Sequence, residues 1–118
     1  MKTTNFLTGM RGQNLAEEHL QDLGYSIIDR NFSTKFGEID LIVQDDKVLV
    51  FVEVKTKIGA DFGSPEDMFT KRKYERVKRM ATLYLSGRSV PCRIDMVAVV
   101  LDRNNQPVSI KHYENVTS

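Results

Sequence analysis

Three carboxylates and one lysine interrupt two apolar segments of this sequence. Glu38 and Asp40 lie in EIDLIV, and Glu53 and Lys55 lie in VLVFVEVK. Clustered like charges in an apolar setting are costly unless salt bridges or a cation stabilise them. Oxygen ligands with room for water are those that Mg²⁺ or Mn²⁺ selects, and a nearby lysine can position water or stabilise charge on a phosphate. These are the parts needed for metal-assisted phosphodiester hydrolysis.

The alternative for the same residues is an ordinary salt bridge. In that case Lys55 simply pairs with Asp40 or Glu53, as a lone Glu/Lys pair at the end of a strand commonly does. The excess of carboxylates over lysine weakens this alternative but leaves it open.

Two strands and a turn must position these side chains. Residues 38–43 and 48–55 are the strands, and the turn-forming residues QDDK at 44–47 join them as a hairpin. Side chains two positions apart in a strand share a face, so the two acids of the first strand lie together, as do the acid and the lysine of the second. If the register fits, Asp40 and Glu53 become neighbours. The second strand is apolar apart from its one acid, which predicts a central strand covered on both faces.

The remaining elements complete a single α/β domain over residues 1–118. Helices are predicted for 12–23 and from Ser64 to about Leu85, and strands for 25–31, 38–43, 48–55, 93–101 and 108–113, the last as an edge strand. The second helix begins with Ser64 as N-cap, Pro65 at the first helical position and Asp67 three residues after the cap. The order α-β-β-β-α-β-β predicts a mixed central sheet flanked by helices. Residues 1–8 and 114–118 are expected to be flexible termini.

Positive charge is concentrated on the second helix and just after it. From Lys71 to Arg93 there are eight basic residues and one acid, Glu75, giving +7, so the rest of the chain carries −6 within a net charge of +1. This block indicates a polyanionic partner, with a solvated helix face as the alternative. The candidates for contacts with a nucleic-acid backbone are Lys71, Arg72, Lys73, Arg76 and Arg79.

Lys73 lies on the apolar stripe of that helix, four residues after Phe69 and four before Val77. Its side chain either extends to solvent or points into the cleft above the sheet, toward substrate phosphate.

Composition excludes several classes of protein and site. The single cysteine, Cys92, excludes an internal disulfide and a cysteine zinc site. No apolar run approaches the roughly 20 residues of a membrane span. The first residues lack the apolar core of a signal peptide, so a cytoplasmic location and no membrane association are expected. His19 and His112 stand isolated in the sequence, without the spacing of metal ligands.

A set of ordered motifs resembles a known family. GYSIIDRN, GEIDLI, FVEVK, FGSPED and RIDMV follow in the order seen in the YraN-like uncharacterised bacterial proteins, over nearly all of residues 9–113. Asp40 followed by Glu53-Val54-Lys55 resembles the signature of the PD-(D/E)xK nuclease superfamily, and in particular archaeal-type Holliday junction resolvases. The resemblance implies the restriction endonuclease-like fold.

The resemblance also implies roles for individual residues. Asp40 and Glu53 match the metal-binding acids, the backbone carbonyl of Val54 matches a further ligand, and Lys55 matches the catalytic lysine. Glu38 matches the acid beside the metal-binding aspartate.

Two positions depart from the family pattern. Gln13 stands where the family usually has a glutamate that completes the metal site, and Glu17, one turn further on, is either its substitute or a surface residue. Ser33 stands where the family often has arginine, which removes one contact to phosphate.

The expected function is therefore Mg²⁺- or Mn²⁺-dependent cleavage of DNA, including branched or otherwise non-duplex DNA. One alternative is a nucleic-acid-binding protein that keeps the nuclease fold with weak or lost catalysis, which Gln13 favours. Another is a structural protein whose charges form internal salt bridges. A homodimer is an option on geometric grounds, since one chain of this size could hardly grip both sides of a junction.

Overall fold

Seven helices and strands make up the part of the chain that the computed structural model describes, residues 2–59 and 69–116. In chain order they are α1 (Lys2–Asp22), β1 (Ser26–Thr34), β2 (Gly37–Asp45), β3 (Val48–Ile58), α3 (Lys71–Leu85), β4 (Cys92–Leu101) and β5 (Pro107–Tyr113). The predicted order α-β-β-β-α-β-β is confirmed.

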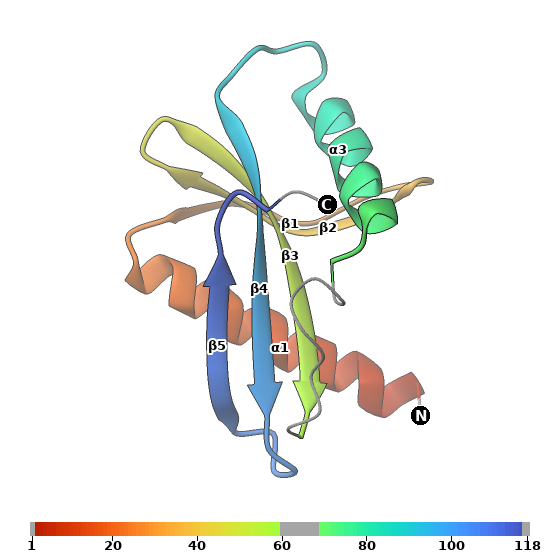
Figure 1. The fold of residues 1–118 in the computed structure, drawn as a ribbon, viewed down its shortest axis with the longest axis vertical. Helices are drawn as coiled ribbons and strands as arrows, with labels where there is room; N and C mark the ends of the chain where they lie inside the picture. Colours follow the sequence, from red (N-terminus) through yellow and green to blue (C-terminus); the bar gives the residue numbers. More distant parts are fainter. Residues whose placement is uncertain (1, 60–68, 117–118) are drawn as a thin grey trace.

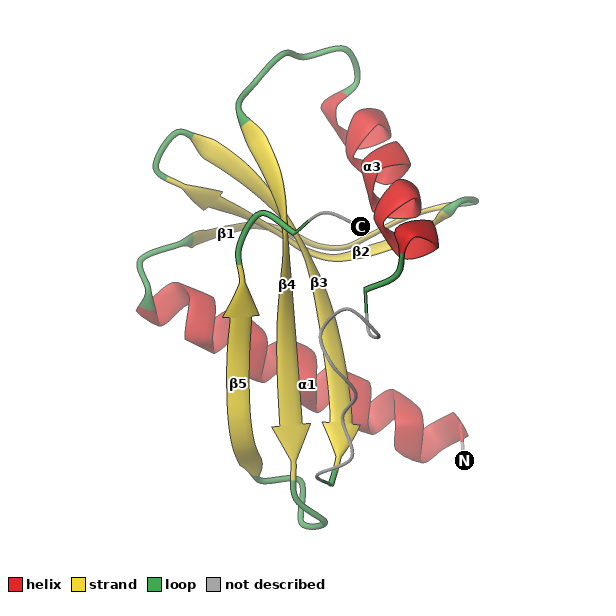
Figure 2. Ribbon diagram, viewed as in Figure 1, coloured by secondary structure: helices red, strands yellow, loops and turns green. Residues whose placement is uncertain are grey.

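The strands form one mixed sheet in the order β1-β2-β3-β4-β5. Only the β3–β4 pair is parallel; β1–β2, β2–β3 and β4–β5 are antiparallel. The predictions that the strand carrying Glu53 is central and that the last strand is an edge are confirmed, as β3 is third of five and β5 is outermost. Figures 1 and 2 show α1 across one face of the sheet and α3 against the other, which is consistent with the restriction endonuclease-like fold.

Two apolar layers hold the helices to the sheet. Under α1 the buried residues are Leu15, Ala16, Leu20, Tyr25, Leu41, Val43, Val50, Val52, Val97, Val99 and Leu101. Under α3 they are Ile39, Ile42, Leu49, Phe51, Phe69, Val77, Met80, Ala81, Ile94, Met96 and Ala98. A glycine sets the position of α1, because a Cβ on Gly12 would lie 1.8 Å from Oγ1 of Thr56 on β3. The helix can approach the strand this closely only with glycine there.

The first helix is longer than the sequence predicts. It begins at Lys2 rather than near Gly12. The prediction used apolar side chains that face a core, whereas Phe6, Leu7 and Met10 are 66%, 56% and 48% exposed. Despite its 21 residues, α1 lacks the apolar character of a membrane span, and so does the other helix within the described ranges.

The second helix begins later than predicted. Thr70 has extended backbone angles, and its hydroxyl accepts a hydrogen bond from the N–H of Lys73, so the helix starts at Lys71. The predicted cap at Ser64, Pro65 and Asp67 lies outside the described residues. The expected end is confirmed, because the helix finishes at Leu85.

Candidate metal and nucleic-acid site

The hairpin of β2 and β3 brings two acids together. Leu41 pairs with Val52 in this antiparallel ladder, so the next positions along the two strands are Asp40 and Glu53. The backbone N–H of Val54 donates a 2.7 Å hydrogen bond to Oδ2 of Asp40. The register that the sequence required for neighbouring acids is the register of the structure.

Asp40 lies where β2 changes the face that it presents to each helix. Ile39 and Ile42 both belong to the apolar layer under α3, while Leu41 and Val43 belong to the layer under α1. Strict alternation would put positions 39 and 41 on the same face, so the alternation is broken around Asp40. Asp40 lines two hollows, one with residues of α1 and one with residues of α3.

Both acids are held in an environment that disfavours their charged forms. Burial, together with the carboxylate of Asp40, raises the pKa of Glu53 above its ordinary value. Burial and the nearby Glu38 also raise the pKa of Asp40. Oε1 of Glu53 is buried and has no hydrogen-bond partner among the described residues. Such an oxygen beside a second carboxylate is suited to a divalent cation, which would favour the ionised form of both groups.

Cations from two elements surround the acids. Nη2 of Arg76 on α3 lies 4.0 Å from Oε2 of Glu53. Burial, followed by the charge of the nearby Lys55, lowers the pKa of Lys73, and both lysines line the hollow that contains the acids. Lys73 is half-buried and lines the same hollow as Asp40 and Glu53, whereas its contact with a substrate phosphate stays a prediction. Among the ion pairs within 4.0 Å in the described ranges, Glu53 pairs with Arg76 and not with Lys55.

Three connected hollows make up the site. The central cleft is lined by Asp40, Glu53, Val54, Lys55, Phe69, Lys73, Arg76 and Met96. The α1 chamber shares Asp40, Val54 and Lys55 with it and adds Phe6, Thr8, Gly9, Met10, Gln13, Asn14, Arg30, Asn31, Glu38 and Thr56. The α3 groove shares Lys73 and Arg76 with it and adds Phe36, Thr70, Arg72, Glu75, Lys78, Arg79, Thr82 and Leu83. The two acids therefore lie between a chamber and a groove of different composition.

Two further candidate ligands on α1 are engaged with β1. Gln13 lines the α1 chamber, but its amide exchanges hydrogen bonds of 3.0 and 3.1 Å with the amide of Asn31. Glu17 forms an ion pair with Arg30. The structure thus brings Gln13 to the wall of the chamber and directs Glu17 to a surface ion pair.

Glu38 also has a protein partner. Its Oε2 accepts a 3.1 Å hydrogen bond from Oγ of Ser33, the residue that stands in place of the family's arginine. Glu38 therefore lies on the rim of the chamber, and it acts on Asp40 by charge repulsion.

The basic block divides into two groups with different surroundings. Five of its members line the α3 groove with one acid, a net charge of +4: Arg72, Lys73, Arg76, Lys78 and Arg79 against Glu75. Lys71 is exposed outside that lining. Phe36 also faces the groove, with the guanidinium of Arg79 and the ammonium of Lys35 each 5.3 Å from its ring centroid. Arg88 instead donates to backbone carbonyls at the end of α3.

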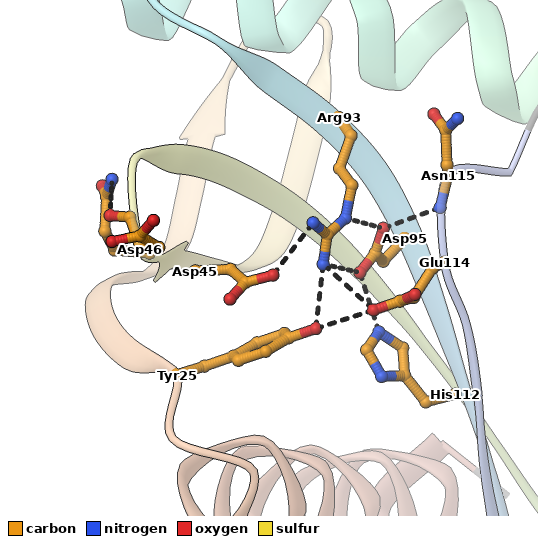
Figure 3. A network of polar contacts seen from close by, with 9 residues as sticks. Tyr25, Asp45, Asp46, Arg93, Asp95, His112, Glu114 and Asn115 are labelled. Carbon is orange, nitrogen blue, oxygen red and sulfur yellow. Dashed lines mark hydrogen bonds and ion pairs between the residues drawn. The ribbon is translucent and has the colours of Figure 1, made fainter.

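A polar network that sequence reasoning missed lies around Arg93 (Figure 3). The guanidinium contacts both oxygens of the fully buried Asp95, at 3.0 and 3.2 Å, and reaches Glu114 at 3.4 Å. Nε2 of His112 lies 2.7 Å from Oδ2 of Asp95. The interpretation of His112 as isolated is wrong, because β4 and β5 pair side by side and bring these residues together.

This network has the ligand types of a metal site but also its own cation. Ligand atoms of Asp95, His112 and Glu114 lie within 4.8 Å of one another, an arrangement that could hold a metal ion. Arg93 already supplies positive charge to Asp95 and Glu114. Asp95 shares its face of β4 with Val97 of the α1 layer and alternates with Ile94 and Met96 of the α3 layer, so the network faces away from Glu53 and α3. The signal in the sequence was the pair of i, i+2 spacings, 93/95 and 112/114, on neighbouring strands.

Comparison with known proteins identifies the family. The sequence profile of the uncharacterised protein family UPF0102 matches residues 12–99. A UPF0102 protein of Corynebacterium efficiens is 44% identical over 118 residues, covering 98% of this chain and 96% of the relative. UPF0102 proteins of Pelotomaculum thermopropionicum and Clostridium botulinum are 37% and 36% identical and cover 92% and 91% of this chain, and 93% and 90% of their own. The chain belongs to the UPF0102 family, and the resemblance to YraN-like proteins is confirmed.

Proposed function

We propose that this UPF0102 protein is a nuclease that uses Mg²⁺ or Mn²⁺ to hydrolyse phosphodiester bonds, with DNA as the expected substrate. The observation that carries the proposal is the buried Oε1 of Glu53, which accepts no hydrogen bond from the described part of the chain and lies beside the carboxylate of Asp40. A protein without a cation to bind has little reason to hold two carboxylates together where burial raises the pKa of both.

In this proposal the residues of the central cleft have different roles in the reaction. Asp40, Glu53 and the carbonyl of Val54 hold the metal ion, which when bound supplies Lewis acidity toward a phosphate oxygen and lowers the pKa of water. Lys55 orients the attacking water or stabilises charge that grows on the phosphate oxygens. Lys73 lies beside Lys55 and contacts the phosphate from the α3 side.

The basic residues of the α3 groove bind the nucleic-acid backbone on the way to the cleft. Their net charge of +4 on one continuous surface favours a polyanion, and phosphate contacts need no particular base sequence. Arg76 belongs to both the groove and the central cleft, so the backbone would reach the acids beside it.

The second candidate is a nucleic-acid-binding protein with weak or lost catalysis. Gln13 supports it, because its neutral amide is occupied by Asn31 rather than offering a charged oxygen to a metal ion. The third alternative, internal salt bridges, describes the Arg93 network well but provides no partner for Oε1 of Glu53 within residues 2–59 and 69–116.

A cleavage assay separates these functions. Linear, nicked, single-stranded and four-way DNA, with matched RNA strands, would be incubated with Mg²⁺ or Mn²⁺. Wild type should cut at least one substrate and Asp40→Asn should cut none, while His112→Gln, outside the central cleft, should keep the activity. Binding without cleavage by wild type would favour the second candidate. If wild type neither bound nor cut any of these substrates, the proposed function would be refuted.

A further inference from the structure

The two ends of the central cleft differ in charge. The α3 groove carries +4, whereas the charged side chains that line the α1 chamber cancel: Arg30 and Lys55 against Glu38 and Asp40. Arg30 is moreover paired with Glu17. A sugar-phosphate backbone therefore finds an excess of positive charge on the α3 side only. Whatever part of a nucleic acid enters the chamber should be uncharged.

The rim and wall of the chamber combine apolar and amide surfaces. Phe6 and Met10, one turn apart on α1, are 66% and 48% exposed although each is large and apolar. Gln13, Asn14 and Asn31 also line the chamber; the amides of Gln13 and Asn31 exchange hydrogen bonds with each other, and each amide has one further N–H and one further lone pair beyond that exchange. A nucleobase has the matching chemistry, with apolar faces that stack on aromatic side chains and polar edges that exchange hydrogen bonds with amides.

The chamber has the size and position for one nucleotide. Its volume of about 690 Å³ lies within the range of small-molecule sites. It shares Asp40, Val54 and Lys55 with the central cleft, so a base held in it belongs to a nucleotide adjoining the phosphate at the acids. Gly12 keeps the wall close to β3, because any side chain there would overlap Thr56.

We propose that the α1 chamber binds an unstacked nucleobase, with Phe6 as the stacking surface, so that the substrates are nucleic acids with unpaired nucleotides next to the bond that is cut. This inference rests on the proposed function and adds the substrate class to it. A base in the chamber cannot remain in a duplex stack, and taking it out of a continuous duplex costs a few kcal/mol that an unpaired base does not require. Single strands and gapped duplexes should therefore bind better than intact duplex.

The test uses the full chain without metal and measures binding to three DNA probes of equal length: single-stranded, gapped duplex and intact duplex. Each probe carries one 2-aminopurine, whose fluorescence rises when the base leaves its stack. Wild type should bind the gapped and single-stranded probes about tenfold more tightly than the duplex, with increased fluorescence. Phe6→Ala should remove about tenfold of that affinity, since stacking on one aromatic side chain contributes roughly 1–3 kcal/mol per base.

A matched control uses another exposed apolar residue. Val108 on β5 is 64% exposed and lies outside all three hollows, so Val108→Ala should bind every probe like wild type. Equal wild-type binding to all three probes, unchanged by Phe6→Ala, would overturn the base-binding inference and leave the proposed function intact. Failure to bind any probe would refute both.

The apolar rim could instead be a protein interface, and sedimentation distinguishes that case. If wild type is a dimer and Phe6→Ala is a monomer with unchanged probe preference, the rim is a contact between copies and the inference is wrong. If wild type and Phe6→Ala have the same oligomeric state and Phe6→Ala loses the probe preference, the base-binding inference is supported.

Discussion

Val54 donates its backbone N–H to Oδ2 of Asp40 at 2.7 Å, so the main chain of β3 fixes the acid on β2. The bond ties the carboxylate to the position directly after Glu53 and before Lys55. A shift of the β2–β3 register would move Asp40 away from Glu53, Val54 and Lys55 together. The arrangement of the candidate site is therefore determined by strand pairing.

Divalent metal should stabilise the folded protein through Asp40. Mn²⁺ at ten times its dissociation constant would stabilise by about 1.4 kcal/mol, or roughly 5 °C in Tm for a domain of this size. Asp40→Asn should abolish the rise. The variant His112→Gln, which tests the Arg93 network in parallel, should keep the rise in Tm. Thermal unfolding across a metal titration measures the rise in both variants. If His112→Gln alone removed the rise, the ion would bind at Asp95, His112 and Glu114 instead.

The metal-free protein should lose stability as pH rises above about 4. The pKa values of Asp40 and Glu53 are raised, so the folded state holds these protons more tightly than the unfolded state does. The resulting stability is fully present below the unfolded values of about 4 and is lost as pH rises through the raised ones.

Urea unfolding at about pH 5 and about pH 8.5 measures this effect. Asp40→Asn should reduce the difference in free energy of unfolding, whereas Glu18→Gln, at an exposed position, should not. Asp95 does not interfere in this range, because hydrogen bonds from His112 and Arg93 outweigh burial and lower its pKa. A free energy that rises with pH in wild type would contradict the arrangement of the two acids.

The Lys55→Ala and Lys73→Ala variants should differ in kinetics although both lysines line the central cleft. Lys55 adjoins the acids in sequence, so Lys55→Ala should lower the cleavage rate at saturating DNA by about 100-fold. Lys73→Ala should mainly weaken binding, by a few-fold. Single-turnover cleavage across DNA concentrations separates the two effects. The opposite pattern would exchange the proposed roles of the two lysines.

The α3 groove should account for the salt dependence of nucleic-acid binding. Each neutralised duplex phosphate contributes about −0.9 to the slope of log affinity against log salt, so three to five contacts predict a slope of about −2.7 to −4.5. Replacing Arg72, Lys78 and Arg79 by alanine should flatten the slope while leaving Arg76 beside Glu53.

The matched control removes the same charge elsewhere. Lys47, Arg103 and Lys111 are exposed and lie outside the groove, and their triple alanine variant should keep the wild-type slope. Fluorescence anisotropy at several salt concentrations, without metal, measures all three proteins. Equal slopes in the two variants would mean that the basic residues of α3 form an ordinary solvated helix face and do not bind nucleic acid.

Gln13→Glu should have opposite effects with and without metal. A carboxylate cannot donate to Oδ1 of Asn31, so the metal-free protein should lose about 1 kcal/mol of stability with that hydrogen bond. With Mn²⁺, the added charged oxygen should tighten metal binding and raise cleavage. Glu17→Gln is the control, since Glu17 pairs with Arg30. Weaker metal binding in Glu17→Gln would identify Glu17 as the ligand.

Local pattern was enough to predict the hairpin and its acids. Asp40 and Glu53 stand out because they interrupt apolar strands, and the turn between the strands is short enough to determine which residues meet. The start of α1 was missed for the converse reason, because Phe6 and Met10 are exposed and give no core-facing period. That Lys55 and Lys73 line one cleft depends on how α3 docks on the sheet, which residue spacing along the helix does not specify.

The Arg93 network could not be predicted from spacing alone. Arg93 and Asp95 share a face of β4, but their partners come from four other places: Tyr25 before β1, Asp45 at the end of β2, His112 on β5 and Glu114 after it. Only the pairing of β4 with β5 makes His112 a neighbour of Asp95. An isolated histidine in sequence is thus a weak guide to its surroundings in a sheet.

The chain order of the β2–β3 hairpin and α3 has a consequence for folding. The hairpin is local and is synthesised first, so Asp40 and Glu53 can meet before Arg76 and Lys73 have left the ribosome. Local contacts form early, whereas the parallel pairing of β3 with β4 must wait for the crossover that contains α3. Until the helix docks, the nascent hairpin carries two facing carboxylates with Lys55 of β3 beside them but without the cations of α3. Arg76 and Lys73, which are proposed to contact the substrate backbone, therefore also compensate the negative charge of the hairpin. Mutations that remove these charges should slow folding of the chain as well as weaken nucleic-acid binding.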